Sequence, residues 1–251
     1  INCWKGVIMN LVAIIDQYLH EDVMIAFSGG VDSTLLLKIA VEASKRYHTH
    51  VYAVTIQTVL HPVMEADEAK RIADELGAIH KVIHVDELEG AGIENNPVDR
   101  CYLCKKYMFT KVKELAHSLG ISTILEGTNA DDLKQYRPGI KAIQELGLHS
   151  PLLEANMTKK EIRELAADYD LKAANKPSSP CLATRFPYHT LLNYEEMRKV
   201  EKIEDYLHAC GFYNVRARIH NDLVRLEIDQ DAFMKCMDYR QEIVLFIKEL
   251  G

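Results

Sequence analysis

The sequence predicts an α/β protein with a parallel sheet in residues 1–190 and a small α+β domain in residues 191–251. Short apolar runs alternate with longer amphipathic stretches in the first part, which is the pattern of strands joined by crossover helices. Two glycines directly follow the first apolar run, as in a tight strand-to-helix turn. After residue 191 the pattern changes to a helix followed by two strands of alternating polarity.

The predicted strands of the sheet are short and apolar. The first, at residues 23–27, has no polar position, as expected of a buried parallel strand. The others are predicted at residues 51–56, 81–85 and 123–125. Ligands of such sheets bind at the carboxyl ends of the strands, so we expect the loops after the first and the fourth strand to share a site.

Helices are predicted between these strands from apolar positions at helical spacing. A short helix at residues 10–18 leads into the first strand, and residues 32–47 form the first crossover. Two further apolar stripes end at Gly77 and at Gly120, and glycine commonly terminates a helix.

Capping residues and prolines locate the elements that follow. Thr158 and Glu161 form a capping box that opens a helix through Tyr169. Residues 175–187 contain three prolines and predict an irregular loop.

The predicted C-terminal domain begins with a helix capped by Asn193. Strands are expected at residues 215–219 and 224–228 because polar and apolar side chains alternate there. A closing helix is expected to run to about residue 249.

Composition indicates a soluble globular protein, with 251 residues of which 48% are hydrophobic and 27% charged. No apolar run approaches the length of a membrane span and no export signal is recognisable, so we expect a cytoplasmic location and no membrane partner. The formal net charge of −7 argues against a large nucleic-acid footprint. Six cysteines in such a chain predict thiols, metal ligands or reactive groups rather than a disulfide framework.

The glycine-rich turn after the first strand has the composition of a phosphate site. Its glycines let backbone N–H groups approach a ligand, its hydroxyls add donors, and the next helix points its positive end into the same space. The Walker pattern G-x-x-x-x-G-K-S/T is absent. The alternative is an ordinary strand-to-helix turn. The residues of this predicted site are Ser28, Gly29, Gly30, Asp32, Ser33 and Thr34.

A second polar loop, residues 126–132, follows the fourth strand. Gly127 would let a nucleotide lie close, and Thr128 would offer a hydrogen bond. Asp131 and Asp132, together with Asp32, could hold Mg²⁺ on the pyrophosphate oxygens of ATP. Taken alone, an acidic loop after a strand is commonly a solvated turn or a helix cap. Its pairing with the glycine-rich turn in one sheet favours a ligand.

Three cysteines lie in segments with the character of a site. Cys101 and Cys104 form a C-x-x-C motif at a helix start, where the positive helix end favours thiolates. Cys181 lies in the proline-rich loop, where Arg185 and backbone N–H groups would lower its pKa. Such a set suits a 4Fe-4S cluster with one iron that lacks a protein ligand. The alternatives are a redox dithiol pair beside a reactive thiol, and incidental thiols. Two further cysteines, predicted to be core thiols, are Cys210 and Cys236.

Two arginines share one face of the first C-terminal strand. Alternation places Arg216 and Arg218 on the same side, where adjacent guanidinium groups could bind a phosphate or a carboxylate. The spacing is equally compatible with a solvated face that forms salt bridges to Glu227 or Asp229.

These motifs together resemble a known family. Residues 28–34 (SGGVDST) resemble the PP-loop of the ATP pyrophosphatases, which split ATP into AMP and pyrophosphate. With residues 126–132 (EGTNADD) and 177–185 (PSSPCLATR), the chain is similar to the LarE family. LarE proteins are ATP-dependent sulfur transferases that help to build the nickel-pincer nucleotide cofactor of lactate racemase. The resemblance covers about residues 11–250.

The resemblance implies a fold like that of the adenine nucleotide alpha-hydrolases and a reaction in two stages. ATP would adenylate a carboxylate of pyridinium-3,5-biscarboxylic acid mononucleotide, with Ser28 and Asp32 in the pyrophosphate cradle. A protein-borne sulfur would then replace AMP and leave a thiocarboxylate. In one branch of the family the cysteine matching Cys181 gives up its own sulfur and becomes dehydroalanine. In another branch three cysteines hold an iron–sulfur cluster whose extra sulfide is the donor, and Cys101 and Cys104 favour that branch.

The resemblance also implies a homo-oligomer and a site for the substrate's phosphate and ribose, formed by Arg185, Glu204, Arg216 and Arg218. The alternatives are a tRNA-thiolating PP-loop enzyme, an ammonia-using amidotransferase and a non-enzymatic nucleotide-binding regulator. A tRNA thiolase would need a basic surface, which the net charge disfavours. An amidotransferase would have no need of the cysteines.

Overall fold

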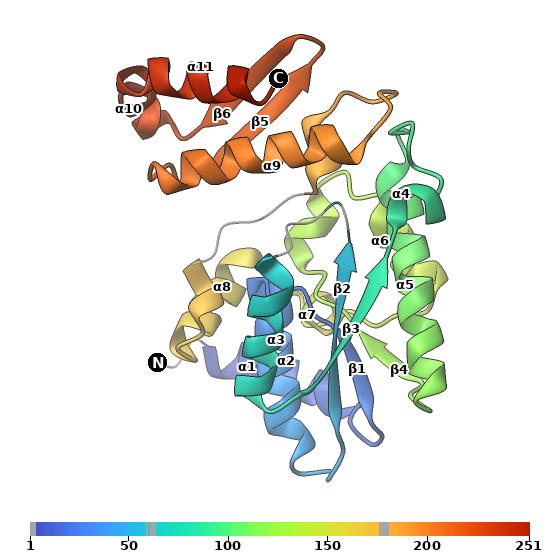
Figure 1. Ribbon diagram of the computed structural model, residues 1–251. Helices are drawn as coiled ribbons and strands as arrows, with labels where there is room; N and C mark the ends of the chain where they lie inside the picture. Colours follow the sequence, from blue (N-terminus) through green and yellow to red (C-terminus); the bar gives the residue numbers. More distant parts are fainter. Residues whose placement is uncertain (1–3, 59, 61–63, 176–180) are drawn as a thin grey trace.

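The computed structural model describes residues 4–58, 60, 64–175 and 181–251, and Figure 1 shows how they are arranged. The strands of the first part form a parallel sheet in the order β3-β2-β1-β4. Their bounds are Val23–Ala26 for β1, Val51–Thr58 for β2, Ile79–Val85 for β3 and Thr123–Leu125 for β4. Each was predicted from the sequence, and the α/β class with a parallel sheet is confirmed.

Helices cover both faces of this sheet, and the alternation of side chains along β1 decides which residues meet which helices. Val23 and Ile25 pack into the cluster formed with α1, α2, α3, α7 and α8, whereas Met24 packs with α5 and α6 on the other face (Figure 1). The helices of the first face are α1 (Trp4–Asp16), α2 (Val31–Ser44), α3 (Met64–Leu76), α7 (Pro151–Glu154) and α8 (Lys159–Asp168). Those of the second face are α5 (Arg100–Ser118) and α6 (Gly139–Glu145).

Helix α2 is buried on nearly all sides. Its only residues that are not buried are Asp32, Lys38 and Glu42, because α1 and α8 pack over the side that faces away from the sheet. The helix begins directly after the glycine-rich turn. Its first turn is therefore fixed relative to the carboxyl ends of the strands, where the predicted phosphate site lies.

The C-terminal elements have the predicted α+β content. Figure 1 shows them above the carboxyl ends of β2 and β3, with an antiparallel hairpin between helices. The closing helix predicted to run to about residue 249 is confirmed as α11, and the structure adds the short helix α10 before it, with a break at Tyr239. Neither glycine nor proline marks this break in the sequence. The elements are α9 (Tyr194–Ala209), β5 (Val215–His220), β6 (Leu223–Ile228), α10 (Phe233–Asp238) and α11 (Arg240–Glu249).

A hydrophobic cluster joins these C-terminal elements to earlier segments. Val200 of α9 and Val215 of β5 pack in the same cluster as Leu60, Ile93 and Leu182. The segment that carries Cys181 is therefore packed between the two parts of the molecule. The division into domains at residue 191 stays a prediction.

The short elements complete the described chain. The predicted irregular loop lies partly outside the described residues, at 176–180, and its described remainder forms short turns.

Among the described residues, none of the helices combines the length and the apolar character that a membrane span needs. The short elements are α4 (Glu87–Gly90), η1 (Ala130–Lys134), η2 (Lys172–Asn175), η3 (Leu182–Arg185) and η4 (Gln230–Ala232).

Candidate functional site

A cavity of about 720 Å³ lies at the carboxyl ends of β1, β2 and β4, and both predicted loops line it. This placement follows from the parallel sheet, whose strands all end at one edge. Gly29 and Thr34 are not part of the lining, and the buried Thr34 side chain has no hydrogen-bond partner among the described residues. The predicted residues that do line the cavity are Ser28, Gly30, Asp32, Ser33, Gly127, Thr128, Asp131 and Asp132.

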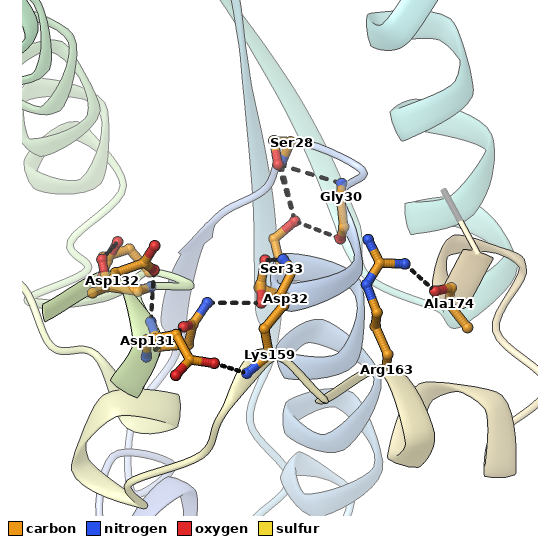
Figure 2. A network of polar contacts seen from close by, with 12 residues as sticks. Ser28, Gly30, Asp32, Ser33, Asp131, Asp132, Lys159, Arg163 and Ala174 are labelled. Carbon is orange, nitrogen blue, oxygen red and sulfur yellow. Dashed lines mark hydrogen bonds and ion pairs between the residues drawn. The ribbon is translucent and has the colours of Figure 1, made fainter. Parts of the chain in front are cut away.

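The glycine-rich turn is held by its own hydroxyl groups (Figure 2). Ser28 Oγ accepts a hydrogen bond of 3.3 Å from the Gly30 N–H, and Ser33 Oγ donates one of 3.2 Å to the Gly30 carbonyl. Gly29 has a φ of 73°, a left-handed conformation that favours glycine. No side chain caps α2 at Gly30, so the first N–H groups of the helix can bind an anion.

Gly127 brings the second loop against the start of α2. A Cβ atom at this position would lie 3.2 Å from the Ser33 nitrogen and 3.3 Å from Asp32 Cβ, which is tighter than ordinary packing allows. The glycine was predicted to make room for a nucleotide. The structure adds a second reason, because the two loops touch each other here.

Asp32 connects three elements at the floor of the cavity. Its carboxylate forms an ion pair with Lys159 of α8 and accepts a hydrogen bond of 3.2 Å from Asn129 Nδ2 (Figure 2). Lys159 also donates its backbone N–H to Asp131 at 2.8 Å. The glycine-rich turn, the second loop and α8 are thereby joined through polar contacts.

The two other predicted magnesium ligands are also engaged. Asp131 forms an ion pair of 2.7 Å with Lys134, and this contact lowers the pKa of Asp131. Asp132 accepts a hydrogen bond of 3.0 Å from the Asn129 N–H and pairs with Arg137 at 3.0 Å. The described residues contain no group of three acidic, histidine or cysteine side chains arranged for a metal. Magnesium that arrives on a nucleotide commonly needs only one or two carboxylates, so these residues fit such an ion.

Basic side chains in the lining were not predicted. Lys159 and Arg163 lie one turn apart on α8 (Figure 2). Lys105 and Arg137 also line the cavity. The sequence analysis recognised only the capping box at the start of this helix, which the structure confirms. The sequence did contain a signal for this basic lining, because Lys159 and Arg163 are four residues apart and therefore share one face of the helix. The basic lining suits a polyphosphate.

The three predicted cysteine ligands lie outside this lining, at the start of α5 and at η3. Cys101 is exposed, Cys104 is buried and Cys181 is half-buried. The three thiols are close enough that the charge on one raises the pKa of another. The structure therefore brings the C-x-x-C motif and the proline-rich loop together.

The predicted activation of these thiols is wrong for two of them. Burial raises the pKa of Cys104 well above its usual range and raises that of Cys181 to about 11. Loss of hydration outweighs the favourable helix end. The cation that opposes this shift at Cys181 is Arg100, whereas Arg185, which was predicted to act, is bonded elsewhere.

The three thiols have the donor chemistry of an iron–sulfur cluster, although the described side chains are not arranged around a metal position. Three thiols from two segments lie beside a hydrophobic cluster, and their thiolate forms repel one another, which bound iron would relieve. By contrast, Cys210 and Cys236 are half-buried against the C-terminal core, as predicted for packing residues.

Arg185 and Glu204 form a buried ion pair. Arg185 Nε and Nη2 donate to the two oxygens of Glu204 at 2.7 and 2.8 Å. Glu204 also accepts a hydrogen bond of 2.8 Å from the Ala217 N–H. The pair joins η3, α9 and β5, and direct contact with a substrate stays a prediction.

The two arginines of β5 have different surroundings. Arg218 donates to Glu227 at 2.8 Å and to the Thr184 carbonyl at 2.6 Å, so the salt-bridge interpretation holds for it. Arg216 is half-buried and forms no hydrogen bond or ion pair within the described part of the chain. Its guanidinium group can therefore bind an anion.

Comparison with known proteins shows the class of protein to which this chain belongs. A family model described as a PP-loop domain matches residues 5–178. The pyridinium-3,5-bisthiocarboxylic acid mononucleotide synthase of Lactiplantibacillus plantarum is 36% identical over 92% of this chain and 83% of its own length. An uncharacterised protein of Synechocystis is 36% identical over 84% of this chain and 78% of its own. The chain therefore belongs to the LarE family of PP-loop proteins.

A solved structure shows the same fold. The U34-tRNA thiolase NcsA from Methanococcus maripaludis, determined with its 4Fe-4S cluster, matches with a TM-score of 0.54 at 18% identity. The match covers 81% of this chain and 75% of that one. At this identity the likeness concerns the fold, and it agrees with the predicted class.

Proposed function

We propose that this protein is an ATP-dependent sulfur transferase that acts on pyridinium-3,5-biscarboxylic acid mononucleotide. It would adenylate a carboxylate, release pyrophosphate and replace AMP with sulfur to give a thiocarboxylate. The proposal rests on the position of helix α5, which connects the cavity to the thiol group. Its residues Lys105 and Met108 line the cavity, and its residues Cys101 and Cys104 belong to the thiol group. The named relative from Lactiplantibacillus plantarum supports the choice of substrate.

In the first stage the glycine-rich turn would bind the pyrophosphate portion of ATP. The uncapped N–H groups of α2 and the hydroxyls of Ser28 and Ser33 face the cavity, with Lys159 beside them. When bound, Mg²⁺ would neutralise phosphate charge and would be held by Asp32 with Asp131 or Asp132. Gly29, Gly30 and Thr34 would shape the turn, and Gly127 and Thr128 would lie beside the nucleotide.

In the second stage sulfur would come from the thiol group. A 4Fe-4S cluster, held by Cys101, Cys104 and Cys181, would when bound supply sulfur at an iron without a protein ligand. Cys181 as a sacrificial donor is the alternative source. The presence of three cysteines in the two neighbouring segments favours the first source.

The substrate's phosphate would be bound by the arginines of β5. Arg216 is the stronger candidate because its guanidinium group has no partner among the described residues, and Arg218 would assist it. Arg185 and Glu204 would hold these arginines and the Cys181 segment in place and complete the site for the ribose.

The first experiment measures pyrophosphate release from ATP. Release should depend on the pyridinium dicarboxylate nucleotide, and Ser33→Ala should slow it because a hydroxyl of the turn is lost. Thr110→Ala, which removes an exposed hydroxyl of α5, serves as the control. Release that requires tRNA, or product formed with ammonia in place of sulfur, would overturn the proposal.

The second experiment identifies the sulfur source. Anaerobically purified protein should be brown, with about four irons per chain. Replacing Cys101, Cys104 or Cys181 by alanine should remove the colour, whereas Cys210→Ala should keep it. Colourless protein whose Cys181 loses the mass of H₂S on turnover would instead establish the sacrificial route.

We also propose a homo-oligomer in the cytoplasm. Apolar side chains of the C-terminal helices are exposed, which suits a contact between copies: Phe233, Met234, Met237 and Leu245. Sedimentation analysis of the purified chain would test this, and a monomer at micromolar concentration would contradict it.

A further inference from the structure

Asn96 and Arg100 join the two segments that carry the cysteines. Asn96 is fully buried, and its Nδ2 donates to the carbonyls of Phe186 at 3.2 Å and Pro187 at 2.7 Å. Its Oδ1 accepts a hydrogen bond from Arg100 Nη1, which also donates to the Ala183 carbonyl at 3.2 Å. The residue that begins α5 therefore also holds the segment after Cys181.

Arg100 is a buried cation, and only 5% of the residue is exposed. Among the described residues it has no carboxylate partner, and its Nε has no hydrogen-bond partner. Its contacts within the described chain are to Asn96, to Ala183 and to the ring of Tyr188, and none of them carries a negative charge. A buried charge of this kind is costly unless an anion lies beside it.

The surroundings indicate where that anion would be. Arg100 directly precedes Cys101, and its guanidinium group donates to the carbonyl of Ala183, two residues after Cys181. Cys104 and Cys181 pack in the same hydrophobic cluster. Both segments that carry the thiols are therefore in contact with the buried cation Arg100.

We propose that the Arg100 guanidinium group is the counter-cation of an anionic sulfur group bound by Cys101, Cys104 and Cys181. Three thiolates around a divalent metal, or around an iron–sulfur cluster, carry a net negative charge that needs such a partner. Arg100 is thus a positioning residue that acts on the sulfur site through the thiolates. The inference rests on the proposed function of these cysteines as the sulfur site.

The test uses Cd²⁺ as a probe on the reduced, metal-free full chain, with binding followed by thiolate-to-metal charge-transfer absorbance. Arg100→Gln should weaken Cd²⁺ binding by about tenfold or more, since a charge-assisted contact is lost. Arg100→Lys keeps the charge and should stay much closer to wild type. Arg71→Gln, an exposed arginine paired with Glu75, is the control and should not change the affinity.

Equal Cd²⁺ affinity in wild type and Arg100→Gln would overturn the inference. It would also be overturned if Arg100→Lys lost as much Cd²⁺ affinity as Arg100→Gln. Arg100→Met, which removes the charge but keeps an apolar stem, supplies a second variant if Arg100→Gln fails to fold. It should weaken Cd²⁺ binding as much as Arg100→Gln does, and wild-type affinity in this variant would overturn the inference. The proposed function fails separately, when the wild-type chain releases no pyrophosphate with its nucleotide substrate.

Discussion

Gly127 determines how closely the two loops that line the cavity approach each other. The atoms that a Cβ would meet belong to the backbone and the Cβ of neighbouring residues, which cannot rotate away. Gly127→Ala should therefore move the second loop by a few tenths of an ångström, at a cost of about 1–3 kcal/mol. We expect weaker ATP binding, measured by calorimetry.

Gly6→Ala is the matched control for this variant. Gly6 lies in α1 with open space around it, so alanine should leave ATP binding unchanged and stabilise the helix by about 0.5–1 kcal/mol. Unaltered ATP affinity in Gly127→Ala would show that the close approach of the loops does not matter for the nucleotide.

Single residues also show what the sequence could and could not predict. The phosphate turn was predictable because Ser28, Gly30 and Ser33 act through local hydrogen bonds within a few positions. The pKa of Cys181 was not, because its main cause is burial by distant segments. Sequence proximity suggested Arg185 as its cation, whereas packing places Arg100 there.

Helix α8 depends on its capping box and carries two cations of the cavity lining. The Thr158 hydroxyl accepts the Glu161 N–H, and the Glu161 carboxylate accepts the Thr158 N–H at 2.8 Å. Thr158→Ala should lower the free energy of unfolding by about 1 kcal/mol. Because Lys159 follows the cap directly, ATP binding should weaken as well.

Urea unfolding and ATP titration measure the two effects in Thr158→Ala. Thr110→Ala in the middle of α5 is the control, since its hydroxyl is exposed and caps no helix end, and it should change stability by less than about 0.5 kcal/mol. A Thr158→Ala protein as stable as wild type would contradict the role assigned to the cap.

At the scale of elements, strands and helices were predictable where their boundaries carry a chemical signal. Thr158 and Asn193 cap their helices as expected, and the hydrogen bonds of both caps are present. The break between α10 and α11 has no such signal, since Tyr239 is neither glycine nor proline. Tertiary packing decides such a position.

In the whole molecule the buried pair of Arg185 and Glu204 ties the C-terminal elements to the Cys181 segment. Glu204→Gln should lower the free energy of unfolding by about 3–5 kcal/mol, because the guanidinium group stays buried without its counter-charge. The double variant Arg185→Met/Glu204→Gln should recover part of this loss. Glutamine keeps an acceptor for the Ala217 N–H.

Denaturant unfolding compares these variants with Glu42→Gln. Glu42 forms an exposed pair with Lys38, so its replacement should change stability by less than about 0.5 kcal/mol. A Glu204→Gln protein that matches Glu42→Gln in stability would show that the buried pair does not join the two parts.

The overall class was predictable because alternating strands and helices admit few arrangements. The position of the C-terminal elements was not, since their cluster includes Leu60 and Ile93, more than a hundred residues from α9 in the sequence. The spacing of apolar residues within one segment predicts its own helix or strand, but it does not predict contacts with segments so far away in the sequence. The thiol group depends on the same long-range packing.

Helix α5 also limits how far a reaction intermediate would have to travel. Cys104 and Met108 are one turn apart, which is about 6 Å along the axis of a rigid helix. An acyl-adenylate formed in the cavity would therefore have only a short distance to cross to reach the thiol group. Water would have little time to hydrolyse it, and each ATP consumed would yield close to one thiocarboxylate.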